Sequence, residues 1–277
     1  MAAAARNAAQ HWRTAAVAGF AGAVFSSLLS LLSVVATSAA PVWTLLSIVV
    51  SAFVYAALIG GALQGPSGLS QRVATEGWRM LGAMAVVGFF LFIVFVVAIV
   101  ADAFILAFAA ADYLPQLQAA GEDPTRVFEV MTRFAQARPG VPIAVFLLNA
   151  FVWMALTSRL YLAAPATYEA QRILTFDTWP WTKGNMLRIL AARLLLLLPV
   201  YLITQALGVG VNLALTPNML DAEALQAAVR ASPALFAVLS VVIEFVQFAV
   251  YFALEAALSV QVYRVLRPQA KTAEAFR

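Results

Sequence analysis

The sequence contains no cysteine and a single histidine, and only 11% of its residues are charged. Without cysteine there are no disulfides, thiolate metal ligands or cysteine nucleophiles. The one histidine, His11, precedes the first apolar run, so we expect no metal, no cofactor and no histidine-based catalysis. A soluble domain carries about 25% charged residues. So few charges cannot cover a surface that faces water.

Apolar residues are abundant instead, at 64% of the chain. We therefore expect lipid to be the solvent over most of the surface, and an all-α polytopic membrane protein without a separate soluble domain. Runs of about 20 apolar residues predict six transmembrane helices, at roughly 15–36, 42–63, 80–101, 141–163, 186–213 and 233–263. They form a single transmembrane domain over 1–277, with three hairpins at about 1–65, 66–165 and 166–277.

The basic residues predict the orientation. Lys and Arg gather on the cytoplasmic side of membrane proteins. One side of the predicted spans has most of the 17 basic residues: Arg6, Arg13, Arg72, Arg79, Arg159, Arg172, Lys183, Arg188, Arg193, Arg264, Arg267, Lys271 and Arg277. The other side has only Arg126, Arg133, Arg138 and Arg230, among acidic residues. We therefore expect both termini in the cytoplasm. The net charge of +4 reflects this bias rather than binding to nucleic acid.

A short motif occurs twice before an apolar run, as RNAAQHWR (Arg6 to Arg13) and RVATEGWR (Arg72 to Arg79). Its two arginines are seven residues apart, on one face of a helix. This pattern is typical of a short amphipathic helix on the inner leaflet, with Trp in the interface. A weaker copy, TWPWTKGNMLRIL, precedes the fifth span. Internal duplication and chance recurrence both remain open. The candidate lipid-phosphate contacts are Arg13, Arg79, Lys183, Arg188 and Arg193.

Two segments on the outer side are predicted to be helical. Asp123 can cap a helix over about 124–138, with Pro124 in its first turn. Its apolar face carries Val127, Val130, Met131 and Phe134. A second helix is expected from about Asp221 to Ala231, with Leu225 and Val229 on one face. Such helices either dock a partner or cover helix ends.

The sixth span carries polar residues at offsets 0, 3, 7 and 11, which place them on one face of an α-helix: Glu244, Gln247, Tyr251 and Glu255. A carboxylate in the membrane is costly and often functional. The sequence places no cation at the same depth. Two interpretations remain open. The face is a proton-sensitive or substrate-lining surface, completed by Gln205 and Asn149, or it makes hydrogen bonds between helices. Asp102 is expected at the outer interface.

Small residues in the first span predict close helix packing, at Gly22, Ser26 and Ser30, with Gly19 and Ser33 nearby. Catalytic motifs are absent. GPSGLS at Gly65 is not a nucleophile elbow, and the sequence has no Walker motif and no His-Glu-x-x-His. We expect no catalytic residue and no enzyme.

The segment RLYLAAPATYEAQRILTFDTWPWTKGNMLRIL, from Arg159 to Leu190, resembles a group of proteobacterial inner-membrane proteins. They are YciC-type six-span proteins, and the membrane domain of some glycerophosphodiester phosphodiesterases is similar. The residues that carry the resemblance are Arg159, Leu160, Leu162, Pro165, Ala166, Trp179, Thr182, Lys183, Gly184, Asn185 and Arg188. The resemblance implies a six-span fold in a bacterial inner membrane and no activity, because the hydrolase domain is missing. In physical terms, Pro165 should end the helix of span four, and Thr182 or Asn185 should cap span five.

Three functional classes follow. The first is a non-catalytic accessory subunit, assembly factor or scaffold, with membrane lipids and a membrane complex or a second copy as partners. The second is a lipid-handling protein or small-molecule carrier that uses the Glu244 face. The third is an intramembrane enzyme. Carriers often contain interrupted helices, and here the candidates Pro199, Gly208 and Gly210 all lie in span five. A scaffold predicts that Glu244→Gln is nearly silent, whereas a proton-coupled carrier predicts lost transport.

Overall fold

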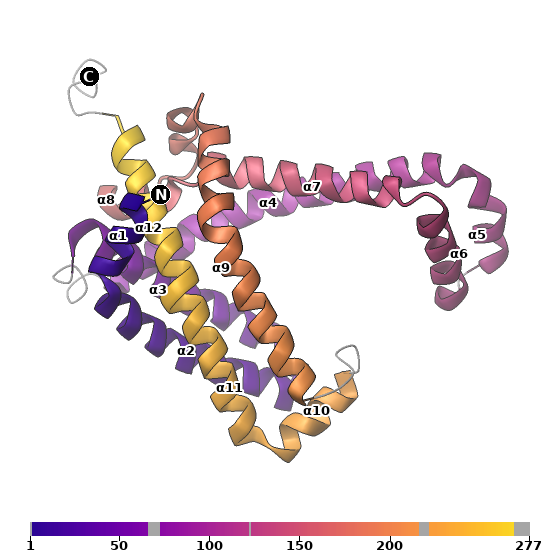
Figure 1. Ribbon diagram of the computed structural model, residues 1–277, viewed down its shortest axis with the longest axis horizontal. Coiled ribbons are helices and arrows are strands. Elements are labelled where there is room, and N and C mark those ends of the chain that lie inside the picture. The colour runs from indigo at the N-terminus through magenta and orange to yellow at the C-terminus, as the bar shows by residue number, and fades with distance from the viewer. Residues whose placement is uncertain (1, 66–72, 122, 216–221, 269–277) are drawn as a thin grey trace. The chain divides into compact units, whose positions relative to one another are not determined.

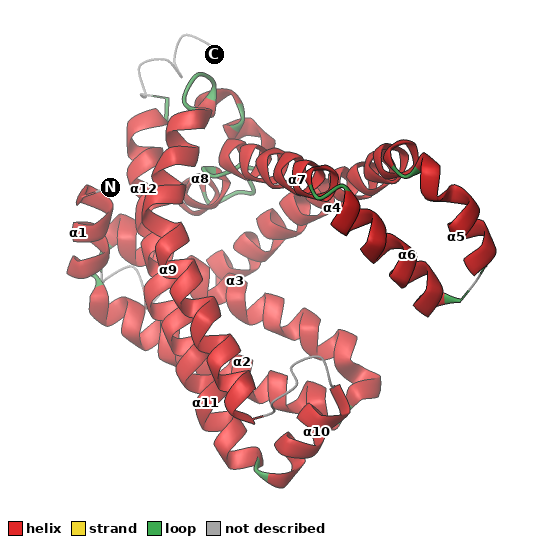
Figure 2. Ribbon diagram, turned by 45° about the vertical axis from the view of Figure 1, so that its right-hand side comes forward, coloured by secondary structure: helices red, strands yellow, loops and turns green. Residues whose placement is uncertain are grey.

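The computed structural model describes residues 2–65, 73–121, 123–215 and 222–268 (Figure 1). Over these ranges the chain forms helices, turns and loops, and no strand (Figure 2). In the described part of the chain, six helical stretches are long and apolar enough to cross a membrane: Trp12–Ser33, Ala40–Gln64, Val73–Ala109, Gly140–Ala170, Met186–Val211 and Pro233–Leu266. This confirms the all-α class and the six predicted spans. The hairpin arrangement and the side of each terminus stay predictions.

The helices, in chain order, are α1 (Ala2–Gln10), α2 (Trp12–Val35), α3 (Ala40–Gln64), α4 (Val73–Ala109), α5 (Leu114–Ala120), α6 (Pro124–Ala137), α7 (Gly140–Arg159), α8 (Ala163–Ala170), α9 (Met186–Leu215), α10 (Ala222–Ala231), α11 (Pro233–Val246) and α12 (Ala253–Leu266). A π-helical segment, Gln247–Phe252, joins α11 to α12. Short 3₁₀ helices lie at Thr37–Ala39, Ala111–Tyr113, Phe176–Thr178 and Pro180–Thr182. Pro199, Gly208 and Gly210 all lie within the unbroken helix α9, so the irregular turn is in span six instead.

The contacts within the chain divide it into two compact units. Unit 1 comprises Met1–Val86 and Ser158–Arg277, and unit 2 comprises Val87–Thr157. The first part of α4 belongs to unit 1 and the rest to unit 2. Each unit is described by itself below, and the expectation of one transmembrane domain over 1–277 stays a prediction.

The core of unit 1 forms where α2 packs against α3, α11 and the π-helical segment. Small residues of α2 allow this approach. A Cβ atom added to Gly19 would lie 2.9 Å from the Cβ of Ala249, and one added to Gly22 would lie 2.5 Å from Cγ2 of Val54. The predicted role of these glycines in helix packing is therefore confirmed. Ile59, Phe248 and Val260 are almost fully buried in this core.

The repeated motif adopts two different structures. In the first copy α1 is a separate helix that packs against α12, and its buried Asn7 donates a hydrogen bond to the carbonyl of Ala62. In the second copy the described residues begin α4 directly, while Arg72 lies outside the described residues. Trp12 and Trp78 are both about 60% exposed, as an interfacial position requires. The likeness of the copies therefore does not extend to their local fold.

The segment with the family resemblance folds tightly within unit 1. Gly60 of α3 leaves room for the buried ring of Tyr168, whose hydroxyl would lie 2.4 Å from an added Cβ. The prediction that Pro165 ends the helix of span four is wrong, because α7 ends at Arg159 and Pro165 lies in the first turn of α8. Proline is tolerated there because the first N–H groups of a helix have no helical acceptor.

Thr182 does not cap span five, although the sequence allowed it. Its hydroxyl donates to the carbonyl oxygens of Trp179 and Arg159, at 2.9 and 3.3 Å. Asn185 directly precedes α9, and Gly184 before it has a φ of +78°, which favours glycine.

Unit 2 contains α4 from Val87 onward, most of α7, and the short helices α5 and α6. Large apolar side chains such as Phe89, Phe108 and Phe146 are more than 60% exposed. A water-soluble surface rarely carries so many, so these faces suit lipid. The predicted helix at 124–138 is confirmed as α6, with the Asp123 carboxylate accepting hydrogen bonds from the backbone N–H groups of Thr125 and Arg126.

The apolar face of α6 packs as predicted. Val130 and Phe134 are buried, and the Phe134 ring lies 5.6 Å from that of Tyr113. The second predicted helix appears as α10 in unit 1, where Val229 is fully buried. Asp221, its expected first residue, lies outside the described residues.

Candidate functional site

A π-helical segment, Gln247–Phe252, interrupts the α-helical spacing of the polar residues of span six. A π turn holds one more residue than an α turn, which rotates everything after it by about 100° relative to an unbroken α-helix. Glu244 precedes this segment, and Glu255 follows it. The angle between Glu244 and Glu255 around the helix axis therefore differs from the one that an α-helix predicts, and their shared face stays a prediction. The two carboxylates have different neighbours.

Glu244 bonds to the neighbouring helix α2. The hydroxyl of Ser26 donates a side-chain hydrogen bond to its carboxylate. Ser26 is buried, at 6% exposure, and Glu244 is half-buried. This contact joins α11 to α2 and corresponds to the interhelical hydrogen bond that the sequence left open. Gln247, the first residue of the π-helical segment, is also half-buried.

Glu255 lies where α3, α9, α12 and the residues after α7 meet. The hydroxyl of Tyr161 donates a hydrogen bond to its backbone carbonyl, at 3.1 Å. Arg193 of α9 is within electrostatic range of its carboxylate. Tyr55, Tyr161 and Tyr251 also interact electrostatically with that carboxylate. The expectation that no cation accompanies the carboxylates of span six is wrong for Glu255, because α9 places Arg193 beside it.

Arg193 is held in place by two partners from one stretch of chain. Its Nη1 donates a hydrogen bond to the Ser158 hydroxyl at 3.0 Å, and its guanidinium carbon lies 4.9 Å from the centre of the Tyr161 ring. A guanidinium over an aromatic face is stabilised by the ring quadrupole. Arg193, which was predicted to contact lipid phosphate near the inner leaflet, is half-buried and has these partners within unit 1, and the lipid contact stays a prediction.

The hydroxyl groups of Tyr55, Ser259 and Tyr251 complete this arrangement. A side-chain hydrogen bond joins Tyr55 of α3 to the buried Ser259 of α12. The Tyr251 ring lies 5.8 Å from the Tyr201 ring on α9. We call the following set the polar cluster: Tyr55, Ser158, Tyr161, Arg193, Tyr251, Glu255 and Ser259. It combines a guanidinium, a carboxylate and several hydroxyls among apolar helices, which can bind a phosphate or another polar group.

The other predicted members of a polar face lie elsewhere. Asn149 of unit 2 donates from Nδ2 to Asp102 at 2.7 Å and to the carbonyl of Val145 at 3.0 Å. Gln205 of α9 is exposed. Asp102 is not at the end of its helix, since α4 continues to Ala109. Its carboxylate instead links α4 to α7.

The remaining predicted lipid contacts differ in their surroundings. Arg13, Lys183 and Arg188 are exposed, and the Arg13 guanidinium carbon lies 5.7 Å from the Trp12 ring. Arg79 is instead paired with Glu76, with its Nη1 2.5 Å from Oε1 of that carboxylate. Exposed side chains can reach lipid phosphate directly, whereas Arg79 can do so only with its remaining N–H groups.

A second polar group ties α8 to the end of α12. The Glu169 carboxylate accepts hydrogen bonds from the Tyr263 hydroxyl and, at 2.5 Å, from Nη1 of Arg267. This carboxylate raises the pKa of the Arg267 guanidinium. Arg264 donates to the carbonyls of Ala62 and Leu63 at the end of α3. These contacts fix the segment that carries the family resemblance.

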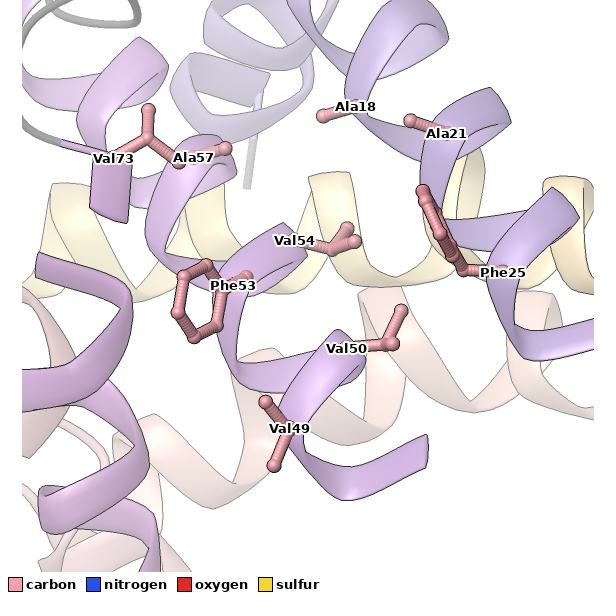
Figure 3. A pocket seen from close by; sticks show the side chains of 10 residues that line it. Ala18, Ala21, Phe25, Val49, Val50, Phe53, Val54, Ala57 and Val73 are labelled. Atoms are coloured by element: carbon pink, nitrogen blue, oxygen red, sulfur yellow. The ribbon is translucent and has the colours of Figure 1, made fainter. Parts of the chain in front are cut away.

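Unit 1 also contains an apolar groove of about 360 Å³, which we call the α2–α3 groove (Figure 3). It is lined by Ala18, Ala21, Gly22 and Phe25 of α2, by Val49, Val50, Phe53, Val54 and Ala57 of α3, and by Val73 of α4. Every lining side chain is hydrocarbon, and small residues on α2 leave the space open. Such a groove can hold an acyl chain.

The sequence signals for the polar cluster were incomplete. Arg193 stands inside the apolar run ILAARLLLLLP, and a cation within such a run marks an intramembrane partner for a carboxylate. Tyr55 and Tyr161 gave no signal, because tyrosine in an apolar stretch is common. No group of three or more His, Asp or Glu side chains among the described residues could hold a metal ion.

Comparisons of the chain with protein-family models, with curated proteins and with solved structures found no match.

Proposed function

We propose that the protein is a non-catalytic, multi-pass protein of a bacterial inner membrane, similar to the YciC-type group, that moves or holds lipid through its polar cluster. Its termini lie in the cytoplasm, and its spans form three hairpins, as the distribution of Lys and Arg predicts. The observation that supports the function is the meeting of Arg193, Glu255 and three tyrosines between apolar helices.

The chemistry of the cluster suits a phospholipid head group. Moving a phosphate into hydrocarbon is costly, and a guanidinium with nearby hydroxyls offsets part of that cost. Arg193 lies beside an irregular turn, because α9 packs against the π-helical segment. Such turns often accompany functional sites, since they offer a second local packing of the helix.

The test is lipid movement in reconstituted vesicles. The full chain is incorporated into vesicles that carry a fluorescent phospholipid, and the fraction that reaches the outer leaflet is measured by chemical quenching. We expect faster movement than in protein-free vesicles. Arg193→Gln and Glu255→Gln should each slow this movement at least about ten-fold, because each removes one charge-assisted contact.

Matched controls are present in the same chain. Arg230 of α10 is exposed and belongs neither to the polar cluster nor to the predicted lipid-phosphate contacts, so Arg230→Gln should move lipid like the unmodified protein. Circular dichroism and gel filtration establish that each variant is folded. Vesicles with protein that move lipid no faster than empty vesicles contradict the proposal.

An accessory-subunit role is the second candidate, and α6 supports it. Phe128 is 72% exposed on this helix, beside the exposed Arg126 and Glu129. An aromatic side chain rimmed by charges is typical of a protein interface. Gentle extraction from the source membrane followed by mass spectrometry should then recover a stoichiometric partner that Phe128→Ser releases. Recovery of the chain alone contradicts this role.

A further inference from the structure

A row of aromatic rings lies beside the carboxylate of the polar cluster. The Tyr251 ring of the π-helical segment lies 5.8 Å from the Tyr201 ring of α9 and 5.6 Å from the Phe252 ring, between ring centres. The Phe252 ring lies 6.1 Å from the Tyr55 ring of α3. We call these four rings the aromatic row. Tyr55 and Tyr251 also interact electrostatically with the Glu255 carboxylate, so the row and the carboxylate belong to one site.

This site is accessible from outside the chain. Tyr201 is 41% exposed. Arg193, Tyr251 and Glu255 are half-buried, so each keeps part of its surface open. Helix α9 runs beside α11 and α12 along unit 1 (Figure 1) and packs against the π-helical segment between them. A head group can therefore contact these side chains from the face where α9 meets the π-helical segment and α12.

The two charged side chains of the polar cluster have opposite sign. The Arg193 guanidinium can bind a phosphate through its N–H groups, as guanidinium groups commonly do. The Glu255 carboxylate lies within electrostatic range of the same guanidinium. A head group that carries only a phosphate is therefore attracted by Arg193 and repelled by Glu255. A head group that also carries a cation has a favourable partner for each of the two side chains.

The aromatic row suits that cation when it is an ammonium group. A cation within about 6 Å of the centre of an aromatic ring is attracted by the ring quadrupole. The rings of Tyr251 and Tyr201 stand on one side of the site, and the Glu255 carboxylate accepts hydrogen bonds from N–H donors. Aromatic faces beside a carboxylate therefore favour an ammonium over an uncharged hydroxyl group.

We infer that the lipid taken by the polar cluster has a zwitterionic head group, in which a phosphate and an ammonium are joined by a short linker, as in phosphatidylethanolamine. The phosphate accepts hydrogen bonds from Arg193, and the ammonium lies between Glu255 and the aromatic row. This inference rests on the proposed function and names the class of lipid that the same site accepts. An anionic lipid such as phosphatidylglycerol lacks the ammonium and leaves the repulsion from Glu255 in place.

The test measures the movement of two lipids by the full chain. The protein is reconstituted into vesicles of equal phosphatidylethanolamine and phosphatidylglycerol with a trace of either lipid labelled on an acyl chain, so that the head group is unmodified. Chemical quenching gives the rate for each probe above that of protein-free vesicles. We expect the ethanolamine probe to move about ten-fold faster, since one charge-assisted contact separates the two lipids.

The outcomes separate this inference from the proposed function. Equal rates for the two probes, or a faster glycerol probe, overturn the inference and leave the proposed function standing. A protein that moves neither probe faster than empty vesicles overturns both.

Two charge variants assign the two contacts. Glu255→Gln should slow the ethanolamine probe and spare the glycerol probe, so the preference should fall from about ten-fold to about one-fold. Arg193→Gln should slow both probes, because both carry the phosphate, and the ethanolamine probe should stay the faster one. A preference that survives in Glu255→Gln, or that is lost only in Arg193→Gln, overturns the inference.

A pair of variants at Tyr201 tests the aromatic row without changing a charge. Tyr201 is exposed, so substitutions there leave the packing of unit 1 in place. Tyr201→Leu removes the ring, and the preference should fall about three-fold, as one cation–π contact implies. Tyr201→Phe keeps the ring and should keep the preference. An unchanged preference in Tyr201→Leu, or an equal loss in Tyr201→Phe, overturns the inference.

An exposed carboxylate elsewhere in unit 1 provides the charge control. Asp177 lies in the 3₁₀ helix Phe176–Thr178, outside the polar cluster and the aromatic row. Asp177→Asn makes the same change of charge as Glu255→Gln and should keep the ten-fold preference. A loss of preference in Asp177→Asn would show that the total charge of the protein selects the lipid, and it would overturn the assignment to Glu255.

Discussion

Units 1 and 2 each carry a carboxylate within a helix of membrane length, but they surround it differently. In unit 2, Asp102 of α4 accepts one hydrogen bond from the Asn149 amide of α7, at 2.7 Å. In unit 1, Glu255 of α12 has an arginine and three tyrosines near it, from α3, α9, the π-helical segment and the residues after α7.

The difference separates a structural contact from a candidate site. One hydrogen bond between two helices contributes about 0.6 kcal/mol in a membrane, and Asp102 with Asn149 has the partners for that role and no more. The polar cluster has more polar groups than two helices need to stay together. The guanidinium of Arg193 is held by the Ser158 hydroxyl and the Tyr161 ring, and these two contacts fix its orientation. Fixed orientation before binding is what a ligand site requires.

The largest effect is expected from breaking the cluster in unit 1. Arg193→Ala should destabilise the protein by about 3 kcal/mol, because it removes the cation–π contact and leaves Glu255 without its cation. Arg188→Ala, at an exposed position on the same helix, should change stability by less than about 0.5 kcal/mol. Unfolding in mixed micelles, followed by circular dichroism, compares the two. Equal losses would show that Arg193 is no more than a surface residue.

A smaller effect is expected in unit 2. A double-mutant cycle with Asp102→Ala and Asn149→Ala should give a coupling energy of about 0.6 kcal/mol, since one interhelical hydrogen bond is removed. The same unfolding measurement on the two single variants and the double variant provides it. A coupling above about 2 kcal/mol would place Asp102 with the functional carboxylates and remove the distinction between the units.

The smallest effect is expected from Glu244→Gln in unit 1. A glutamine side-chain oxygen can still accept the hydrogen bond of the Ser26 hydroxyl, so stability should change by less than about 0.5 kcal/mol. Lipid movement should also be unchanged, which makes this variant the matched control for Glu255→Gln on the same span. A loss of movement in Glu244→Gln would extend the site to α11, the first part of span six.

The fold was largely predictable, because long apolar segments indicate membrane-spanning helices by their length and composition alone. All six spans were found, and α6 was predicted from the capping residue Asp123 and its apolar face. The π-helical segment was not, because nothing in QFAVYF distinguishes it from α-helix, and close packing around Phe248 selects it. The role of Pro165 was predicted wrongly, because a proline can follow the end of one helix or stand in the first turn of the next. Only the packing of the chain decides between these two positions.

The candidate site was half predictable. Glu255 and Tyr251 were recognised as polar residues in an apolar span, but the partners on other helices were not. Tyr55 and Tyr161 are distant in sequence, and only the packing of α3 and the residues after α7 brings them to α12. The burial of Glu76 could not be predicted, because this residue belongs to a motif that is typical of an interfacial helix.

The most direct test compares one substitution in each unit. Vesicles with unmodified protein, Glu255→Gln or Asp102→Asn are assayed side by side for transbilayer movement of the fluorescent phospholipid. The account predicts that Glu255→Gln slows movement at least about ten-fold while Asp102→Asn moves lipid like the unmodified protein. Equal rates for both variants, or a slower Asp102→Asn, would contradict the assignment of function to the polar cluster.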